Sequence, residues 1–264
     1  TGERAPHISA VQSINPYTGA DSHGDGFIPG AVEAEAYADF QAPARADLGN
    51  RPLPDIADLE VAARRWGLTE DRPVVVYDGD RAMTAARAWW VLKWAGLKDV
   101  RVLDGGLPAW VSAGFPLSEA PDTKAESAIS LSPGHMPEFG ADEALAIARD
   151  GVLLDARIRP NYIGGPEKGG DPKRGHIPGA ISAPTLDTLM DPGPFTDSAT
   201  LKELFSGLGV DGANRVGVYC GAGMSAAHEV LALAAIGVEA ALYPGSWSQW
   251  VNDPSRPVKR GPHP

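Results

Sequence analysis

The chain is poor in cysteine: Cys220 is the only one among 264 residues. A single cysteine cannot form a disulfide within the chain, so the fold is not built on a disulfide framework, and we expect a cytoplasmic protein. Long apolar runs are also missing, because no segment approaches the roughly 20 apolar residues that a membrane-spanning helix needs. Residues 1–6 contain no apolar core of a signal peptide. We therefore expect no membrane partner.

Positive charge is in deficit, with 23 Lys and Arg against 34 Asp and Glu and a net charge of −11. Such a chain repels nucleic-acid phosphates, so we expect no nucleic-acid partner, and an anionic ligand would need a local positive site. The six histidines are scattered along the sequence and form no cluster with the spacing of metal ligands. We therefore expect no metal and no organic cofactor.

The two halves of the chain carry related motifs in the same order. Residues 26–31 (GFIPGA), 73–79 (PVVVYDG) and 104–110 (DGGLPAW) match residues 175–180 (GHIPGA), 215–221 (RVGVYCG) and 244–250 (PGSWSQW). Three motifs in one order, with offsets that drift slowly, indicate a duplicated domain with small insertions and deletions.

Each copy alternates short apolar runs with helical patterns. Apolar runs at 74–77, 100–103, 152–155 and 216–219 predict strands, and the patterns at 82–94, 141–149 and 226–236 predict helices. Short strands separated by helices indicate an α/β fold, in which a mostly parallel sheet carries helices on both faces. Residues 116–138, rich in Ser, Pro, Ala and Glu, predict a linker between a first domain at 1–115 and a second at 139–264.

Cys220 lies between a predicted strand and a predicted helix. The unpaired N–H groups and the positive dipole end of that helix favour a thiolate over a thiol. Gly221 and Gly223 allow the backbone conformations of a tight anion-binding loop. The alternative is an inert core cysteine, because free cysteine is among the most buried residue types. The first copy carries Asp78 at the matching position and cannot use this nucleophile.

With these motifs the chain resembles the tandem rhodanese family, which includes the thiosulfate and 3-mercaptopyruvate sulfurtransferases. The matching segments are residues 154–157 (LDAR), 175–180, 220–226 (CGAGMSA) and 243–250. The resemblance implies two tandem rhodanese-like domains, the first non-catalytic, and a Cys220 persulfide that passes its sulfur to an acceptor such as thioredoxin or cyanide. The loop N–H groups are then expected to bind the persulfide. The loop residues are Gly221, Ala222, Gly223, Met224, Ser225 and Ala226.

The loop departs from both kinds of sulfurtransferase. Thiosulfate-specialised members of the family carry cationic residues directly after the cysteine, where this chain has Gly221 and Ala222. Mercaptopyruvate-type members resemble it better, but they use a hydroxyl at the position of Ala222 and an arginine at the position of Asn161. We expect a small anionic sulfur donor, with a preference for 3-mercaptopyruvate or another organic thiol.

Three arginines are candidates for binding the anionic end of the donor. Arg51 stands about where the family has a histidine, and Arg174 lies in the segment 167–174, where a second family arginine is expected and two lysines are further candidates. Arg157 is the third candidate. An arginine two residues after a strand-end aspartate also forms structural ion pairs, in this chain with Asp155.

The first copy is more degenerate at its start. By the repeat, residues 10–12 (AVQ) align with residues 155–157 (DAR), and Phe27 replaces His176, whose ring we expect to hold a turn rather than to act in catalysis.

Two other functions stay open. Phosphatases and arsenate reductases of related fold need an arginine at the end of the loop, where this chain has Ala226, and this argues against phosphoryl chemistry. A sulfur-relay module that accepts sulfur only from a partner protein is the second alternative.

Overall fold

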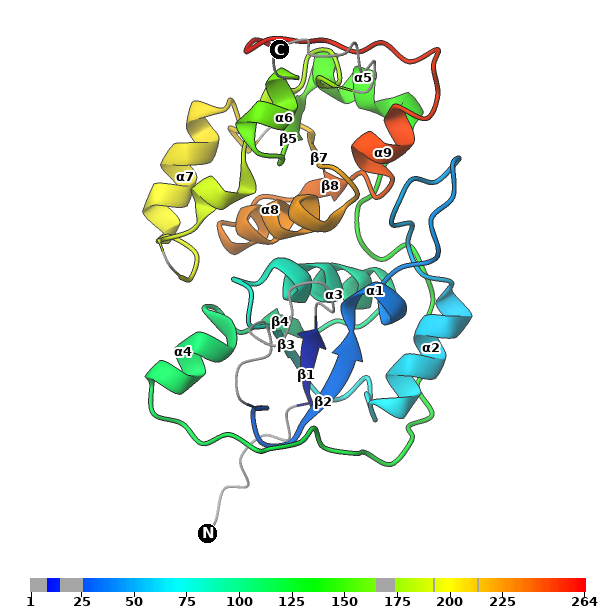
Figure 1. Cartoon of the computed structure of the whole chain (residues 1–264), viewed down its shortest axis with the longest axis vertical. Helices are drawn as coiled ribbons and strands as arrows, with labels where there is room; N and C mark the ends of the chain where they lie inside the picture. Colours follow the sequence, from blue (N-terminus) through cyan, green and yellow to red (C-terminus); the bar gives the residue numbers. More distant parts are fainter. Residues whose placement is uncertain (1–8, 15–25, 165–173, 192, 213) are drawn as a thin grey trace. The chain divides into compact units, whose positions relative to one another are not determined.

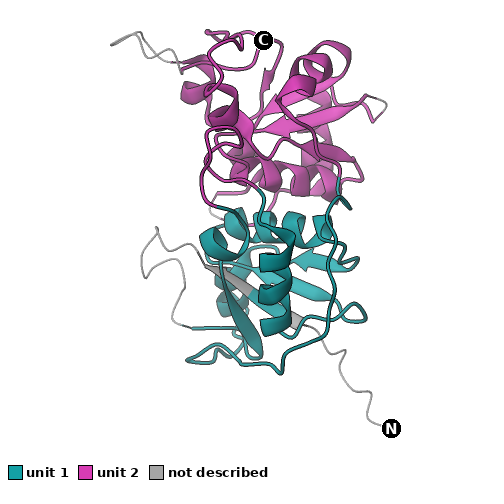
Figure 2. Cartoon of the chain, turned by 90° about the vertical axis from the view of Figure 1, so that its right-hand side faces the viewer, with its two compact units in different colours: residues 1–42, 53–136 teal, residues 43–52, 137–264 magenta. Residues whose placement is uncertain are grey.

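The computed structural model describes residues 9–14, 26–164, 174–191, 193–212 and 214–264. The chain divides into two compact units, coloured separately in Figure 2. The first unit comprises residues 1–42 and 53–136, and the second comprises residues 43–52 and 137–264. The short segment 43–52 therefore belongs to the second unit although it interrupts the sequence of the first.

The first unit contains a four-stranded sheet in the order β2-β1-β3-β4, with every pair of neighbours parallel. Its strands are β1 (Ser9–Ile14), β2 (Ala31–Glu35), β3 (Val74–Tyr77) and β4 (Val100–Val102) (Figure 1). Its helices are α1 (Ala36–Asp39), α2 (Ile56–Arg65), α3 (Met83–Trp94) and α4 (Gly106–Ser112).

The second unit repeats this sheet in the order β6-β5-β7-β8, again all parallel. Its strands are β5 (Val152–Asp155), β6 (Ile181–Ser182), β7 (Val216–Tyr219) and β8 (Ala240–Leu242). Its helices are α5 (Ala141–Asp150), α6 (Arg159–Ile163), the 3-10 helix η2 (Thr185–Thr188), α7 (Ser198–Gly207), α8 (Met224–Ala235) and α9 (Ser246–Trp250). The predicted duplication and the predicted α/β class are both confirmed.

Both faces of the second sheet are covered. Successive strand residues point to opposite faces, and all four residues of β7 are buried. On one face Leu153 and Tyr219 share a hydrophobic core with Ile147 of α5 and Trp250 of α9. Residues of the other face, such as Val218, are equally buried, and α8 packs against β7 and β8. The carboxyl ends of β5 and β7, two adjacent strands in which every residue is buried, thus emerge side by side.

At the helices that follow β3 and β7, the residue before the first turn offers no capping side chain. At α2 and α7 an aspartate takes this place, as where the Asp197 carboxylate accepts the N–H groups of Ala199 and Thr200 at the start of α7. The residues before α3 and α8, Ala82 and Gly223, adopt a left-handed conformation and have no such cap. The first N–H groups of these two helices therefore point toward the preceding loop.

One predicted alignment between the copies is wrong. The strand register places Gln12 opposite Tyr77 in the first unit, as it places Asp155 opposite Tyr219 in the second. Gln12, and not Ala10, is therefore the counterpart of Asp155. A slip of two residues keeps every side chain on its own face of a strand, so the apolar pattern could not reveal it.

Residues 116–138 have neither a helix nor a strand in the described structure, apart from isolated bridges. Up to residue 136 they pack along the first unit, where Arg64 Nε donates to the Ile129 carbonyl and the His135 N–H to the Trp94 carbonyl. Over the described ranges, each helix is too short or too polar to cross a lipid bilayer.

Candidate active site

Cys220 follows directly after β7 and is 2% exposed. The chain then turns through Gly221, Ala222 and Gly223, and α8 begins at Met224. Gly223 has a φ of +83°, a conformation that glycine adopts without steric cost. In this conformation its N–H points back to the cysteine and lies 3.1 Å from Sγ. The sulfur therefore accepts a backbone hydrogen bond at the start of a helix, where a negative charge is favoured.

The backbone of Cys220 is held by the first residues of α9. Its N–H donates to Ser246 Oγ at 3.2 Å, and its carbonyl accepts the N–H of Trp247 at 2.9 Å. The next carbonyl, that of Gly221, accepts the N–H of Ser248 at 2.9 Å. The nucleophile candidate is thus held from two sides, by the loop that leads into α8 and by the first turn of α9.

A buried network of charge and hydrogen bonds lies at the ends of β5 and β7. The fully buried Asp155 carboxylate binds the Arg157 guanidinium at 2.5 Å and the Tyr219 hydroxyl at 2.6 Å. Burial opposes the charge of Arg157, but the hydrogen bonds that it donates to Asp155 keep its pKa above the ordinary value. Burial and the Asp155 charge raise the pKa of Tyr219 well above its ordinary value, so its hydroxyl donates to Asp155.

The same hydroxyl holds the turn that contains His176. Tyr219 Oη accepts the N–H of Ile177 at 3.1 Å. The His176 ring stacks on Tyr162 with centroids 3.8 Å apart, and its Nδ1 lies 2.9 Å from the Tyr162 carbonyl. Burial lowers the pKa of His176, which keeps the ring neutral near pH 7. Its contacts are those of a residue that holds a turn, as the sequence predicts.

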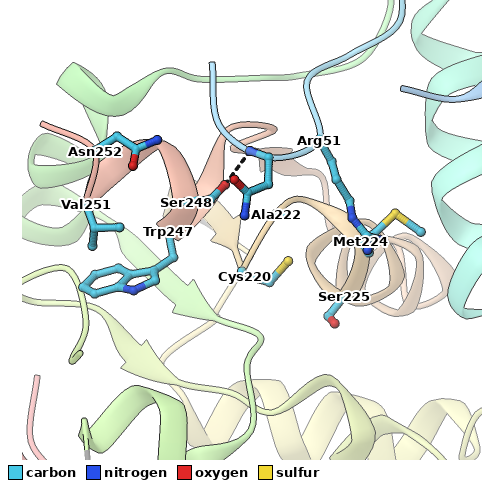
Figure 3. Close-up of a pocket in the computed structure, with 11 residues that line it drawn as sticks. Arg51, Cys220, Ala222, Met224, Ser225, Trp247, Ser248, Val251 and Asn252 are labelled. Carbon is cyan, nitrogen blue, oxygen red and sulfur yellow. Dashed lines mark hydrogen bonds between the residues drawn. The ribbon is translucent and has the colours of Figure 1, made fainter. Parts of the chain in front are cut away.

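The sulfur of Cys220 opens into a pocket of about 560 Å³. In Figure 3 it points toward the side of the pocket where Arg51, Met224 and Ser225 lie, and away from Trp247. The pocket is lined by Asn50, Arg51, Cys220, Gly221, Ala222, Met224, Ser225, Trp247, Ser248, Val251 and Asn252. All of the described residues that line the pocket belong to the second unit.

The segment 43–52 brings Arg51 to the pocket. Asn50 N donates to Ser248 Oγ at 2.9 Å, and a dashed line ends at this oxygen of Ser248 in Figure 3. Gln249 Nε2 donates to the Asp47 carbonyl at 2.7 Å. Both contacts join the segment to α9. Arg51 is the one cation among the described residues that line the pocket.

The other predicted cations lie elsewhere. Arg157 does not line the pocket, because its guanidinium is bound to Asp155 and to the Gly175 carbonyl and lies over the Trp247 ring. Arg174 is exposed outside the pocket. The two lysines of the segment 167–174, at 168 and 173, fall outside the described residues.

Five of the described lining residues were not predicted as site residues from the sequence: Asn50, Trp247, Ser248, Val251 and Asn252. Trp247 and Ser248 belong to the repeated motif at 244–250, and this repeat could have marked them as candidate site residues. Nothing local marks Asn50, because its place in the pocket depends on the path of segment 43–52. Within the described residues, no three His, Cys, Asp or Glu side chains are grouped to hold a metal ion.

The equivalent loop of the first unit binds a carboxylate. Asp78 is 2% exposed and follows β3 as Cys220 follows β7. Its Oδ1 accepts the N–H groups of Asp80 and Ala82, and its Oδ2 those of Thr84 and Ala85, each at 2.9 Å. Thr84 Oγ1 adds a further bond at 3.0 Å. The loop and helix start that the two units share therefore form an anion-binding geometry.

Comparison with known proteins identifies the fold of both units. A family model described as the rhodanese-like domain matches residues 18–113 and, a second time, residues 140–253. The chain belongs to the rhodanese family. The first match contains β2, β3 and β4, and the second contains all four strands of the second sheet together with Cys220 and its loop.

Named relatives span most of this rhodanese chain. "Putative thiosulfate sulfurtransferase SseB" of Mycobacterium tuberculosis is 45% identical over 242 residues, covering 89% of this chain and 84% of the relative. "Probable 3-mercaptopyruvate sulfurtransferase" of Pseudomonas aeruginosa is 41% identical over 261 residues, covering 94% and 89%. The crystal structure of the 3-mercaptopyruvate sulfurtransferase SseA from Escherichia coli superposes with a TM-score of 0.77 at 28% identity, covering 92% of this chain and 94% of that one.

Proposed function

We propose that this rhodanese is a sulfurtransferase that carries a sulfane sulfur as a persulfide on Cys220 and takes it from 3-mercaptopyruvate or a similar organic thiol. The observation that carries the proposal is the hydrogen bonding of Asp78. From Cβ outward, an aspartate side chain (Cγ, Oδ) and a cysteine persulfide (Sγ, Sδ) have the same number of atoms in line. Asp78 therefore marks where the outer sulfur of a persulfide would lie in the second unit.

The N–H groups that receive that sulfur follow from the comparison of the two helices. Counted from the preceding residues Ala82 and Gly223, the N–H groups of Thr84 and Ala85 correspond to those of Ser225 and Ala226. The first pair binds Asp78 Oδ2. The second pair would bind the outer sulfur, while Gly223 N–H remains on Sγ. Charge that develops on sulfur during transfer is stabilised by donors that are already in place.

The reaction proceeds by two displacements at sulfur. The Cys220 thiolate attacks the sulfur atom of the donor and forms a sulfur–sulfur bond. With 3-mercaptopyruvate the carbon–sulfur bond breaks, and its electron pair leaves with the pyruvate enolate, which takes up a proton. With thiosulfate the sulfur–sulfur bond of the donor breaks and sulfite leaves. An acceptor thiolate or cyanide then attacks the outer sulfur, and the Cys220 thiolate is released.

The pocket supports an organic donor. Its volume of about 560 Å³ falls in the range of small-molecule sites and exceeds the needs of thiosulfate. Trp247, Val251 and Met224 supply apolar surface for a carbon skeleton. Arg51 supplies the positive charge for a carboxylate, a task that its planar fork of donors fits.

The acceptor and the compartment belong to the same proposal. An open pocket that a peptide thiol can enter suits thioredoxin or a small thiol, with cyanide as a laboratory acceptor. The single cysteine supports a reducing, cytoplasmic compartment, where a persulfide is consumed by thiols.

Intact-mass measurement after exposure to each donor tests the proposal. The wild type should gain the mass of one sulfur atom from 3-mercaptopyruvate, and Cys220→Ala should gain nothing. With cyanide as acceptor, kcat/KM should be higher for 3-mercaptopyruvate than for thiosulfate. A clear preference for thiosulfate would refute the donor assignment alone. Sulfur uptake only from a persulfide-bearing partner protein would refute the enzyme and identify a relay module.

A further inference from the structure

Ser246, the first residue of α9, has an unfavourable backbone conformation. Its φ of +52° lies in the left-handed region, where only two other non-glycine residues of the described structure are found. A side chain there brings Cβ close to a carbonyl oxygen, a cost that glycine avoids. Such conformations persist where the surrounding structure enforces them, and they gather at functional sites. Ser246 is completely buried, so its conformation is set by the core around it.

The hydroxyl of Ser246 contacts the residue that carries the nucleophile. Oγ accepts the N–H of Cys220 at 3.2 Å and donates to the Tyr243 carbonyl at 2.7 Å. The neighbouring N–H of Trp247 binds the Cys220 carbonyl. Two consecutive residues thus hold both polar backbone groups of the cysteine, and only one of them does so through a side chain.

The first unit provides an internal comparison. Its equivalent turn has Gly106 with a φ of +57°, followed by Leu107, whose N–H binds the Asp78 carbonyl at 2.8 Å. A Cβ on Gly106 would lie 2.3 Å from the Asp78 carbonyl oxygen, so this turn has no room for a serine. The same turn therefore carries a glycine beside the aspartate and a strained serine beside the cysteine.

The difference between Gly106 and Ser246 matches the way in which Asp78 and Cys220 are held. Asp78 is anchored through its own side chain by four N–H groups and a hydroxyl. In the described structure Cys220 Sγ has a hydrogen bond from Gly223 N–H alone. A sulfur with so few anchors depends on its backbone for its position, and Ser246 Oγ supplies an anchor that the first unit does without.

We infer that Ser246 is a positioning residue for the Cys220 nucleophile: its hydroxyl fixes the cysteine N–H so that Sγ meets the donors at the start of α8. The inference deepens the proposed function and rests on it for the reaction itself. The strained backbone is retained because glycine, which would relieve it, has no hydroxyl.

Two substitutions separate positioning from simple structural support. Ser246→Gly and Ser246→Ala both remove the hydroxyl, but only glycine relieves the strain, so Ser246→Gly should be the more stable of the two in thermal unfolding. Ser206→Ala, at an exposed position of α7, is the control for loss of a serine. Each variant is assayed for persulfide formation from 3-mercaptopyruvate and for the pH profile of Cys220 alkylation by iodoacetamide.

We expect both Ser246 variants to lose about tenfold in kcat with little change in KM, the effect of one hydrogen bond. We also expect the midpoint of alkylation to move to higher pH in both, and Ser206→Ala to behave as the wild type. If Ser246→Gly were as active as the wild type, so that the loss of activity only followed the loss of stability, the inference would be wrong. It would also be wrong if the pH profile of alkylation were the same in the variants as in the wild type. Alkylation needs no sulfur donor, so this readout remains decisive even if the wild type forms no persulfide and the proposed function fails.

Discussion

Asp78 and Cys220 occupy the same position in the two units, directly after β3 or β7 and at the start of loops that differ by one residue in length. Each follows a buried tyrosine at the end of a central strand, and each accepts a hydrogen bond from the residue that precedes the next helix, Ala82 or Gly223. One copy binds a permanent carboxylate, and the other presents a thiol that can be charged with sulfur. After the duplication, the second unit thus carries a loop with a reactive thiol, whereas in the first unit the Asp78 side chain occupies the N–H groups of its own loop.

Removing the carboxylate of Asp78 should destabilise the first unit. Asp78→Ala leaves the buried N–H groups of Ala82, Thr84 and Ala85 without their acceptor, and we expect a loss of about 3 kcal/mol in the free energy of unfolding. Urea denaturation measures it. Asp99→Ala, which removes an exposed ion pair with Arg101, is the control and should leave the free energy of unfolding nearly unchanged. Equal losses in the two variants would contradict the proposed role of the loop N–H groups.

Neutralising Arg51 should weaken the binding of an anionic donor. For Arg51→Gln we expect KM for 3-mercaptopyruvate to rise about tenfold, the loss of one charge-assisted interaction. The KM of Arg51→Lys should lie between those of the wild type and Arg51→Gln, because lysine keeps the charge but not the fork of donors. Steady-state kinetics at fixed ionic strength measure the effect. Arg149→Gln, whose ion pair with Asp150 is exposed, is the matched control; if it raises KM as much, overall charge and not Arg51 is responsible.

The buried pair of Asp155 and Arg157 should be far more sensitive than an exposed pair of the same chemistry. Asp155→Asn leaves the guanidinium of Arg157 buried without its counter-ion and weakens the bond from Tyr219, so we expect a loss of about 3–5 kcal/mol. Asp150→Asn breaks a surface pair with Arg149 and should change the free energy of unfolding very little. Chemical denaturation of both variants decides whether burial makes this difference.

Glu229, on α8, should make stability depend on pH. Its carboxyl is fully buried, and neither oxygen has a partner among the described residues. Burial, with the charges of Asp155 and Cys220, raises its pKa well above the ordinary value. The unfolded chain therefore releases the proton first, and stability falls as pH rises from the unfolded pKa, about 4.3, toward the folded one.

Glu229→Gln removes this titration without changing the size of the side chain. The stability of the wild type relative to Glu229→Gln should fall with rising pH, by at most about 1.4 kcal/mol per pH unit. Urea denaturation of both proteins at several pH values gives the slope. A difference that stays constant with pH would mean that Glu229 has the same charge in the folded and unfolded chain.

Local sequence patterns predicted the strands and the position of the nucleophile candidate closely. The runs at 74–77, 152–155 and 216–219 are the observed strands β3, β5 and β7, because a buried strand between turn residues has a clear apolar signature. The alignment of the degenerate strand β1 was wrong by two residues, because a period of two hides such a slip.

By itself the sequence determined the duplication, the parallel α/β architecture and the cysteine at a strand-to-helix loop, because short, contiguous patterns of residues indicate each of them. The tertiary structure decided which side chains surround that cysteine. It brought Arg51 to the pocket on a segment distant in sequence, bound Arg157 to Asp155 outside the pocket, and placed Ser246 Oγ on the Cys220 N–H. These contacts depend on the path of the chain and on competition between partners, which no local pattern encodes.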